Sequence, residues 1–161
     1  MKPPSLPVDE EARQQARSLI QNARHAALGV LLEDGLPFVA RIAFGTAPDG
    51  MPVTLISDLA RHTGALRRHP ACSLLIGDPG PKGDPLTHPR LSLMATAEFM
   101  SRDTSRCAEV RAHYLQTHPK SKLYADFADF HFVGFNIREA HLNGGFARAF
   151  TLTASDLGLD G

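Results

Sequence analysis

Residues 37–57 read PFVARIAFGTAPDGMPVTLIS, two mainly apolar runs separated by Pro48, Asp49 and Gly50. A Pro-Asp-Gly turn between runs rich in Val, Ile and Phe is typical of a β-hairpin. The stretch therefore predicts two antiparallel strands joined by a tight turn. Strands that follow one another through hairpins favour an antiparallel sheet over one built from strand–helix–strand units.

Further strand-like runs lie on both sides of this hairpin. The upstream run ends at the turn Glu33-Asp34-Gly35. Strands are expected at 25–32, 71–77, 90–100, 129–142 and 146–150, helices at 61–69 and 103–119, and a Pro- and Gly-rich loop at 78–89. Six or seven strands with a few helices predict a mainly β (α+β) fold, an antiparallel barrel with short helices packed at its ends.

The N-terminal residues form an arm followed by a helix. Three prolines within residues 1–8 predict a flexible arm. Asp9 is the expected N-cap of an amphipathic helix that runs to about Arg24. Neither an internal repeat nor a linker interrupts the rest, so residues 9–161 are expected to form a single domain.

Composition excludes several classes of protein. The 161 residues include 17 basic and 17 acidic side chains, for a formal net charge of zero. A nucleic-acid or anionic-membrane binder needs an excess of Lys and Arg, so neither partner is expected. A pocket for one small anion remains compatible with this balance.

The cysteines and apolar runs indicate where the protein resides. Cys72 and Cys107 lie far apart and form no Cys-x-x-Cys pair, which favours two reduced thiols. No apolar run reaches the roughly 20 residues that span a bilayer, and the first residues lack the apolar core of a secretory signal. We therefore expect a cytoplasmic protein.

The 37–57 hairpin predicts a specific cross-strand pair. If the turn is centred on Asp49, residues whose numbers sum to 98 face each other. Arg41 then lies opposite Ser57, on one face of the sheet with Cβ atoms about 5 Å apart. The same register sets Ala43 opposite Leu55 and Phe44 opposite Thr54.

A short segment after Ser57 adds donors to this pair. Arg61, His62 and Thr63 lie at the start of the expected helix, whose first N–H groups lack partners within the helix. Guanidinium, hydroxyl and helix N–H groups together are typical of a phosphate site. The alternative is a structural ion pair between the arginines and Asp58 or Glu98, because an Arg within an apolar strand needs an anionic partner.

Residues 37–77 resemble the core of the pyridoxamine 5′-phosphate oxidase-like FMN-binding split barrels. The similarity is greatest to the heme-utilisation (HugZ-like) branch, in which a strand ending in Ser leads into Leu-Ala-x-His-Thr, here Ser57 to Thr63. GDPL at 83–86, HPR at 88–90, YLQTHPKSKLYADFADFHF at 114–132 and GGFARA at 144–149 also resemble that branch. Together these motifs extend over roughly residues 20–150.

This resemblance implies a fold, a cofactor and a set of contacts. The fold is an antiparallel split β-barrel, the cofactor is FMN, and the assembly is a homodimer with FMN in the groove between subunits. The residues at the matching positions, implied to bind the cofactor, are Arg41, Ser57, Arg61, His62, Thr63 and Arg90. A flavin enzyme of this type needs few catalytic side chains, so no catalytic residue is assigned and the small-molecule substrate is left open.

Two activities of related proteins fit this sequence poorly. The vitamin-forming oxidases bind substrate through Arg-x-His and Tyr…Arg…Ser motifs, but here Arg138 and His141 have the wrong spacing and His118 replaces the Arg after Tyr114. Heme-utilisation proteins ligate heme through a histidine in a C-terminal extension, and here the last histidine is His141. His131 and His141 are the remaining candidates for a heme ligand.

Three hypotheses follow from these residues. The first is a dimeric FMN-dependent oxidoreductase, the second a non-enzymatic flavin- or heme-binding protein, and the third a structural barrel whose arginines only form internal ion pairs. No metal site is expected, because the histidines show no metal-binding spacing and no Cys/His cluster occurs.

Overall fold

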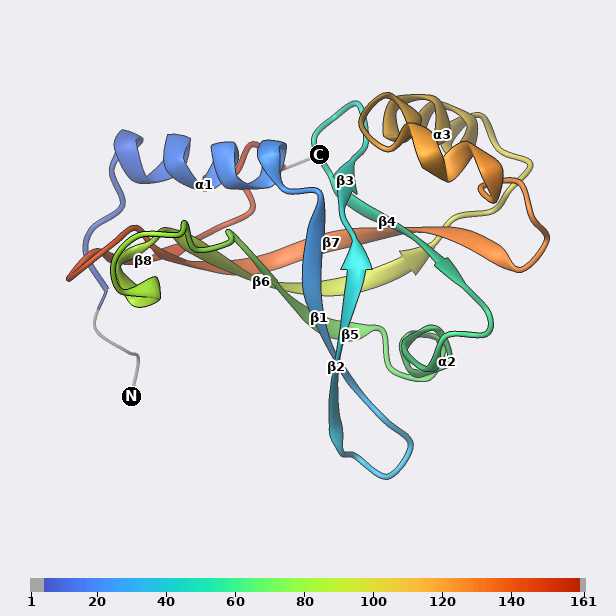
Figure 1. Ribbon diagram of the computed structural model, residues 1–161, viewed down its shortest axis with the longest axis horizontal. Helices are drawn as coiled ribbons and strands as arrows, with labels where there is room; N and C mark the ends of the chain where they lie inside the picture. The colour runs from blue at the N-terminus through green and yellow to red at the C-terminus, as the bar shows by residue number, and fades with distance from the viewer. Residues whose placement is uncertain (1–4, 160–161) are drawn as a thin grey trace.

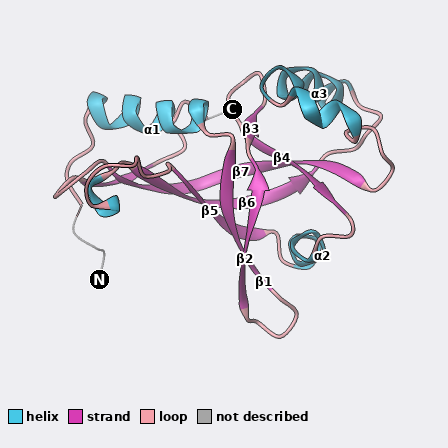
Figure 2. Ribbon diagram, in the orientation of Figure 1, coloured by secondary structure: helices cyan, strands magenta, loops and turns pink. Residues whose placement is uncertain are grey.

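Tight turns divide the chain into strands that form one curled antiparallel sheet (Figures 1 and 2). Gly35 and Gly50 occupy the left-handed region, with φ of 82° and 92°, where glycine is favoured in the predicted turns. The computed structural model describes residues 5–159. Its strands are β1 (His25–Leu31), β2 (Pro37–Ala43), β3 (Gly45–Thr46), β4 (Pro52–Ser57), β5 (Ala71–Ile76), β6 (Arg90–Phe99), β7 (Phe130–Asn143) and β8 (Ala149–Leu152).

Three α-helices and two 3₁₀ turns connect these strands. They are α1 (Glu10–Asn22), α2 (Arg61–Arg68), α3 (Ser105–Thr117), η1 (Pro85–Thr87) and η2 (Pro119–Leu123). Figure 1 shows α1 and α3 along the upper side of the sheet and α2 near its lower end, close to the β1–β2 hairpin. The predicted cap Asp9 and the N-cap of α3, Thr104, each accept a hydrogen bond from the first turn of their helix.

The strand order explains why the sheet is an open barrel. Neighbouring strands follow the order β2-β1-β5-β6-β7-β4-β3, and β8 pairs with β7. β2 and β4, which the sequence joins through a single hairpin, therefore lie near opposite ends of this order. The prediction of an antiparallel barrel with helices at its ends is confirmed.

The predicted register of the 37–57 hairpin holds at its tip and fails beyond it. Gly45 pairs with Val53 and Thr46 with Pro52, and both sums are 98 as predicted. The predicted Arg41–Ser57 pair is wrong. Arg41 pairs with Ala27 of β1, whereas Ser57 pairs with Phe130 of β7.

The buried side chain of Phe44 marks the place where the two strands separate. Its backbone N–H donates to the carbonyl of Arg24, 2.9 Å away, rather than across the hairpin. β4 instead gains five ladder pairs with β7, between Val53 and Ser57. A long central strand offers β4 more backbone hydrogen bonds than β2, which β1 already pairs along its whole length.

Two hydrophobic clusters lie on the two sides of these strands. The larger fills the barrel and includes Ile42, Ile56 and Leu66. The smaller lies under α3 and contains Leu55, with Ala43 packed against it. Since side chains alternate along a strand, Arg41 and Ser57 share the face of Ala43 and Leu55 although they form no ladder pair.

Both ends of the chain differ in detail from expectation. Residues 1–4 of the predicted arm lie outside the described residues, but the N–H of Leu6 donates to the carbonyl of Ala149 at 2.8 Å, which ties residues 5–8 to β8. The last strand was expected at 146–150 and lies at Ala149–Leu152. The preceding turn is longer because Gly145 and Ala147 have positive φ of 128° and 60°.

Candidate functional site

The N-terminus of α2 has no cap from its own sequence. Ala60 occupies the N-cap position, makes no side-chain hydrogen bond, and no acidic residue lies in the first turn. The first N–H groups of a helix have no partner within the helix, and they carry partial positive charge. Here Arg61 adds a full positive charge, so the start of α2 is suited to an anion.

The junction between β4 and α2 is fixed by hydroxyl groups. The hydroxyl of Thr63 donates to the carbonyl of Ser57 at 2.6 Å, and the Thr63 side chain is buried. The Ser57 hydroxyl accepts from the N–H of Leu59 at 3.1 Å and donates to Asp129 Oδ2 at 3.3 Å. The Thr63 hydroxyl thus uses its one donor to hold the turn. The Ser57 hydroxyl donates only through a long bond to a carboxylate, which another acceptor could replace.

The two basic residues at the helix start differ in charge. Arg61 is exposed, and its guanidinium carbon lies 5.4 Å from the ring centroid of Phe38 on β2. His62 is half-buried, and burial lowers its pKa, so its imidazole is neutral at neutral pH. His62 Nε2 is buried without a hydrogen-bond partner. Of these two residues, only Arg61 supplies a permanent charge.

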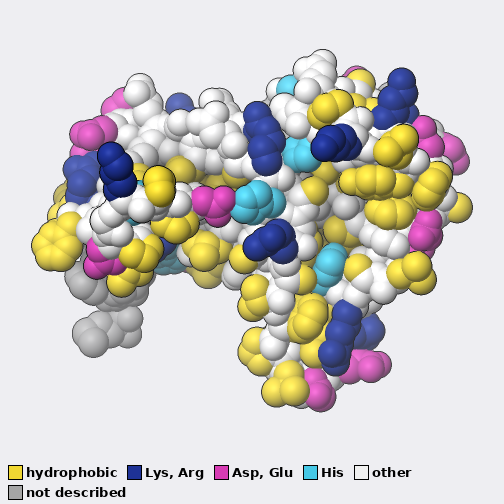
Figure 3. All heavy atoms as spheres, viewed as in Figure 1, with side chains coloured by type: hydrophobic (Ala, Val, Ile, Leu, Met, Phe, Trp, Pro, Cys, Tyr) yellow, Lys and Arg dark blue, Asp and Glu magenta, His cyan; other side chains and the backbone are white. Residues whose placement is uncertain are grey.

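Arg41 is exposed on β2 and is free of ion pairs within residues 5–159. Its cross-strand neighbour Ala27 also pairs with Leu75, so these three residues form a row across β2, β1 and β5. Arg41 lies three residues from Phe38 on β2, so the two side chains leave opposite faces of the strand, and Phe38 is the one that contacts Arg61. Hydrophobic side chains and Lys or Arg side chains lie next to each other on the lower lobe in Figure 3, which Figure 1 assigns to the β1–β2 hairpin and α2.

Among residues 5–159, neither Arg41 nor Arg61 forms the structural ion pair with Asp58 or Glu98 that was the alternative. Asp58 Oδ1 lies 2.9 Å from His131 Nε2 and 3.2 Å from Arg67 Nη2. Glu98 accepts a hydrogen bond from the amide of Asn136 at 3.0 Å. Both carboxylates thus have other partners, and the two arginines keep their capacity for an external anion.

Arg90 lies apart from this cluster. It begins β6, and its guanidinium donates to the carbonyls of Leu86 and His88 at 3.0 and 3.5 Å. Leu91 pairs with Ile76 at the end of β5, whereas α2 leads into the start of β5 at Ala71. At about 3.3 Å per residue, Arg90 is some 16 Å along the strand from α2.

Sequence reasoning missed two residues at the β4–α2 junction. Asp129 lies just before β7 and His131 lies within it, and both reach the Ser57–Asp58 turn because β4 pairs with β7. Only the strand order brings them together, since more than 70 residues separate them along the chain. Strand pairing between residues 129–142 and 51–57 would have revealed them, and the sequence alone does not specify that pairing.

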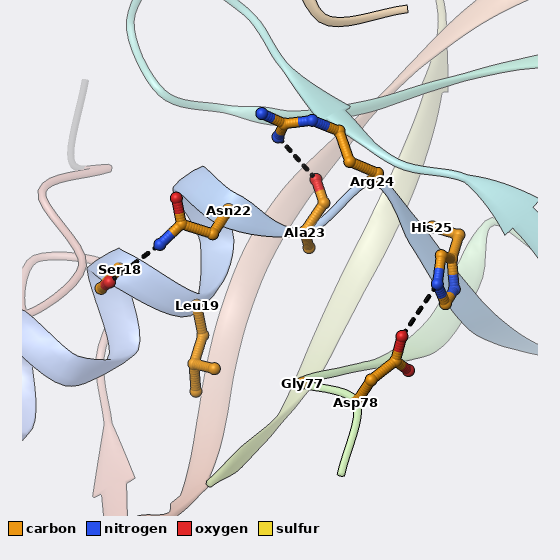
Figure 4. A pocket seen from close by; sticks show the side chains of 8 residues that line it. All are labelled: Ser18, Leu19, Asn22, Ala23, Arg24, His25, Gly77 and Asp78. Carbon is orange, nitrogen blue, oxygen red and sulfur yellow. Dashed lines mark hydrogen bonds and ion pairs between the residues drawn. The ribbon is translucent and has the colours of Figure 1, made fainter. Parts of the chain in front are cut away.

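A hollow of about 330 Å³ beside the end of α1 was also not anticipated (Figure 4). Ser18, Asn22, His25 and Asp78 are among its lining residues, and His25 Nε2 lies 2.9 Å from Asp78 Oδ2. Its polar side chains bond mainly to one another. It lies apart from α2 and does not include the predicted cofactor residues.

The helix motif that binds substrate in the vitamin-forming oxidases is closed in this chain. Tyr114 is fully buried, and His118 stacks on its ring with centroids 4.2 Å apart. His118 Nε2 lies 3.1 Å from the carbonyl of Arg24. Burial raises the pKa of Tyr114 to about 12. These side chains are used for packing α3 against the sheet.

The family model for the CREG β-barrel matches residues 7–156. The chain belongs to this CREG β-barrel family. The chloroplastic heme oxygenase HOZ of Arabidopsis thaliana is 36% identical over 118 residues, which are 73% of this chain and 35% of that protein. The chain thus spans about a third of the length of this curated relative.

Two solved structures agree with the fold. A heme-binding protein from Mycobacterium smegmatis matches with a TM-score of 0.85 and 26% identity, over 94% of this chain and 62% of that one. A pyridoxinephosphate oxidase-family protein from Clostridium acetobutylicum, related to general stress protein 26, matches with a TM-score of 0.68 and 14% identity, over 93% and 99% of the two chains. The split-barrel fold implied by the resemblance is confirmed.

The described part of the chain has three further features. No helix within it is long and apolar enough to cross a membrane. Among residues 5–159, no three His, Cys, Asp or Glu side chains are grouped to hold a metal ion. Cys72 and Cys107 are both free, and burial raises the pKa of Cys72 to about 11.

Proposed function

We propose that this CREG-family protein binds FMN by its phosphate at the N-terminus of α2 and acts as a flavin-dependent oxidoreductase on a small molecule. The observation that carries the proposal is the uncapped start of α2, with Arg61 beside unpaired N–H groups. A phosphate monoester carries nearly two negative charges and three acceptor oxygens, so it matches such a donor set.

Each nearby residue has a role in this proposal. The guanidinium groups of Arg41 and Arg61 pair with the phosphate, and the N–H groups of Arg61 and His62 donate to it. The Ser57 hydroxyl exchanges its 3.3 Å bond to Asp129 for a phosphate oxygen. Thr63 positions the turn, and Arg90 stays a prediction as a contact to the flavin.

Bound flavin supplies the hydride or electron transfer, while the protein binds and orients it. Pyridoxine-phosphate oxidation is not proposed, because Tyr114 and His118 stack on each other instead of facing a substrate. We assign no catalytic acid or base to this site, so the contribution proposed for the chain is binding and orientation of the flavin. The substrate is a small molecule that reaches the flavin ring.

We further propose a homodimer with the cofactor at the subunit interface. Leu31, Val39 and Leu75 are 41%, 67% and 46% exposed on the outer face of β1, β2 and β5. Arg41 lies on this same face, beside a hollow of about 560 Å³ lined in part by Gly29 and Pro37. A second copy that covers these apolar side chains would also enclose the base of Arg41.

The visible spectrum of the purified protein tests the cofactor. Bands near ~370 and ~450 nm are expected for bound flavin from the chemistry of the isoalloxazine ring. Titration with FMN and riboflavin then tests the phosphate site: Arg41→Ala should weaken FMN by roughly 1.5–3 kcal/mol and leave riboflavin nearly unchanged. A colourless protein that ignores added FMN would end the flavin proposal.

Heme is a second candidate cofactor, favoured by the names of two relatives. HOZ is a heme oxygenase and the Mycobacterium smegmatis structure is a heme-binding protein. Heme also combines a flat ring with acidic groups, which suit Arg41 and Arg61. Of the two candidate ligands, His131 is close to Asp58, whereas His141 Nε2 lies 3.9 Å from Glu139 and is partly exposed.

Addition of hemin to the flavin-free protein tests this second candidate. A Soret band that shifts in His141→Ala would support heme binding through His141. Arg61→Ala tests a different placement, with the acidic groups of heme held at α2, where flavin and heme would compete for one cation; His141 pairs with Ser92, near the distant Arg90. Saturation by FMN that leaves hemin binding unchanged would place the two ligands at different sites.

A further inference from the structure

Four side chains fasten both ends of α2 to the sheet. Asp58, just before the helix, lies 2.9 Å from His131 of β7 and 3.2 Å from Arg67 in the last turn of α2. The guanidinium carbon of Arg67 lies 4.1 Å from the ring centroid of Phe99 on β6. The edge of the same ring faces His131, with centroids 6.2 Å apart.

The position of Asp58 needs an explanation if α2 binds an anion. A carboxylate three residues before Arg61 repels an anion at the helix start by its charge. Its pKa is lowered, first by the contact with His131 and then by Arg67, so it is ionised at neutral pH. If Asp58 helps anion binding at α2, it must do so by fixing the position of the helix and not by its charge.

Both partners of Asp58 contact the same atom, Oδ1. His131 belongs to the sheet and Arg67 to the last turn of α2. The carboxylate between them therefore fixes how α2 is oriented relative to the sheet. The backbone of Asp58 is fixed as well, because its N–H donates to the carbonyl of Asp129 at 2.7 Å. The turn between Ser57 and Arg61 is thus tied at both ends.

We infer that Asp58 is a positioning residue that aims the start of α2 at the phosphate, with His131 and Arg67 as its anchors. The inference rests on the proposed phosphate site and deepens it. Asp58 does not touch the phosphate, and it keeps the N–H groups of Arg61 and His62 turned toward the same point. A charge effect and a positioning effect of Asp58 therefore predict opposite changes in FMN affinity when its carboxylate is removed.

Asp58→Ala separates positioning from charge. If Asp58 acts only by its charge, removing it strengthens FMN binding. If it positions α2, FMN affinity falls about tenfold, the size of a lost interaction with a charged group, while riboflavin changes little. Fluorescence titration of flavin on the full chain measures both ligands, and the thermal midpoint of the flavin-free protein reports whether the variant is folded.

The His25–Asp78 pair provides a matched control. Its atoms are also 2.9 Å apart, and it lies beside α1 rather than α2. Asp78→Ala removes a more exposed carboxylate that also has a histidine partner, so it should leave the FMN-to-riboflavin affinity ratio unchanged. An equal loss in both variants would overturn the positioning role of Asp58.

Two substitutions of His131 test the anchor without removing the carboxylate. A glutamine amide can take the place of Nε2 as a donor, whereas leucine cannot. We expect His131→Gln to keep the affinity ratio within about twofold and His131→Leu to lose about fivefold, as for a lost polar contact with a charged group. Equal ratios in the two variants would contradict the inference.

The outcomes also separate this inference from the proposed function. If the unmodified protein binds FMN no more tightly than riboflavin, there is no phosphate site and both proposals fail. If Arg61→Ala loses FMN while Asp58→Ala binds it equally well or more tightly, the phosphate site stands and the positioning role fails.

Discussion

Helices α1 and α2 begin in opposite ways. At α1, Asp9 accepts a 2.8 Å hydrogen bond from the N–H of Ala12, and Glu10 and Glu11 lie in the first turn. At α2, Ala60 caps nothing, and Arg61 and His62 take the place of the acids. The chain satisfies the positive end of α1 with its own carboxylates and leaves that of α2 without one.

The C-terminus of α2 shows that this difference is local. Arg67 and Arg68 lie in its last turn, where positive charge complements the helix dipole. Only the first turn of α2 opposes the dipole. A helix that follows the rule at one end and breaks it at the other points to an external anion at the end that breaks it.

The largest expected effect comes from Arg61→Ala. We expect FMN affinity to fall by roughly 1.5–3 kcal/mol, because a charge-assisted hydrogen bond to the phosphate is lost. Riboflavin affinity and the unfolding midpoint should change little. Arg68→Ala, at the other end of the same helix, is the matched control in the flavin titration, and an equal loss there would indicate a general charge effect.

Asp9→Ala tests the opposite helix. The free energy of unfolding should fall by about 1 kcal/mol, since an N-cap hydrogen bond is lost. FMN affinity should stay the same, because α1 has no part in the phosphate site. Urea denaturation measures the first quantity and flavin titration the second. A loss of FMN affinity would show that α1 and α2 are coupled.

Much of the fold could be predicted because local signals and packing agree. Turns with glycine, alternating apolar residues and the Asp9 cap predicted α1 and most of the strands to within two residues, whereas the last strand begins three residues later than expected. The hairpin register at Gly45 and Thr46 was also predictable from the turn at Asp49. Each of these features is decided within a few residues of sequence.

The site was predictable only in part, because its geometry depends on strand order. The turn at Asp49 favours Arg41 opposite Ser57, but β4 leaves β2 at Phe44 and pairs with β7. Asp129 and His131 then reach the junction from a distant segment. The neutral state of His62 follows from its burial, which the sequence motif does not reveal.

Ala60→Asp would make α2 more similar to α1. A carboxylate at the N-cap should raise the free energy of unfolding by about 0.5–1 kcal/mol. It should also weaken FMN binding, because the new side chain occupies the N–H groups and repels the phosphate. Ala60→Ser supplies the cap without the charge, so it should stabilise the protein and affect FMN less. Unchanged FMN affinity in both variants would contradict a phosphate at this helix.

The smallest expected effect is on the pH dependence of stability, through Asp156, which holds Arg13 of α1. Asp156 accepts the N–H of Thr153 at 2.9 Å and the guanidinium of Arg13 at 2.8 Å, and these contacts lower its pKa from the ordinary value of 3.8. A carboxyl group with a lowered pKa stabilises the fold above its ordinary pKa, and this stabilisation is lost as pH falls through the lowered value.

Asp156→Asn should therefore reduce the thermal midpoint at neutral pH and reduce it less as the pH falls below the ordinary carboxyl range. Thermal unfolding of both proteins between about pH 2 and pH 6 measures this difference. Because Asp156 supports α1 and not α2, FMN affinity at neutral pH should be the same in the two proteins. A midpoint difference that stays constant across the acid range would mean that Asp156 acts by packing. The attachment of α1 would then depend on side-chain packing more than on the charge of this carboxylate.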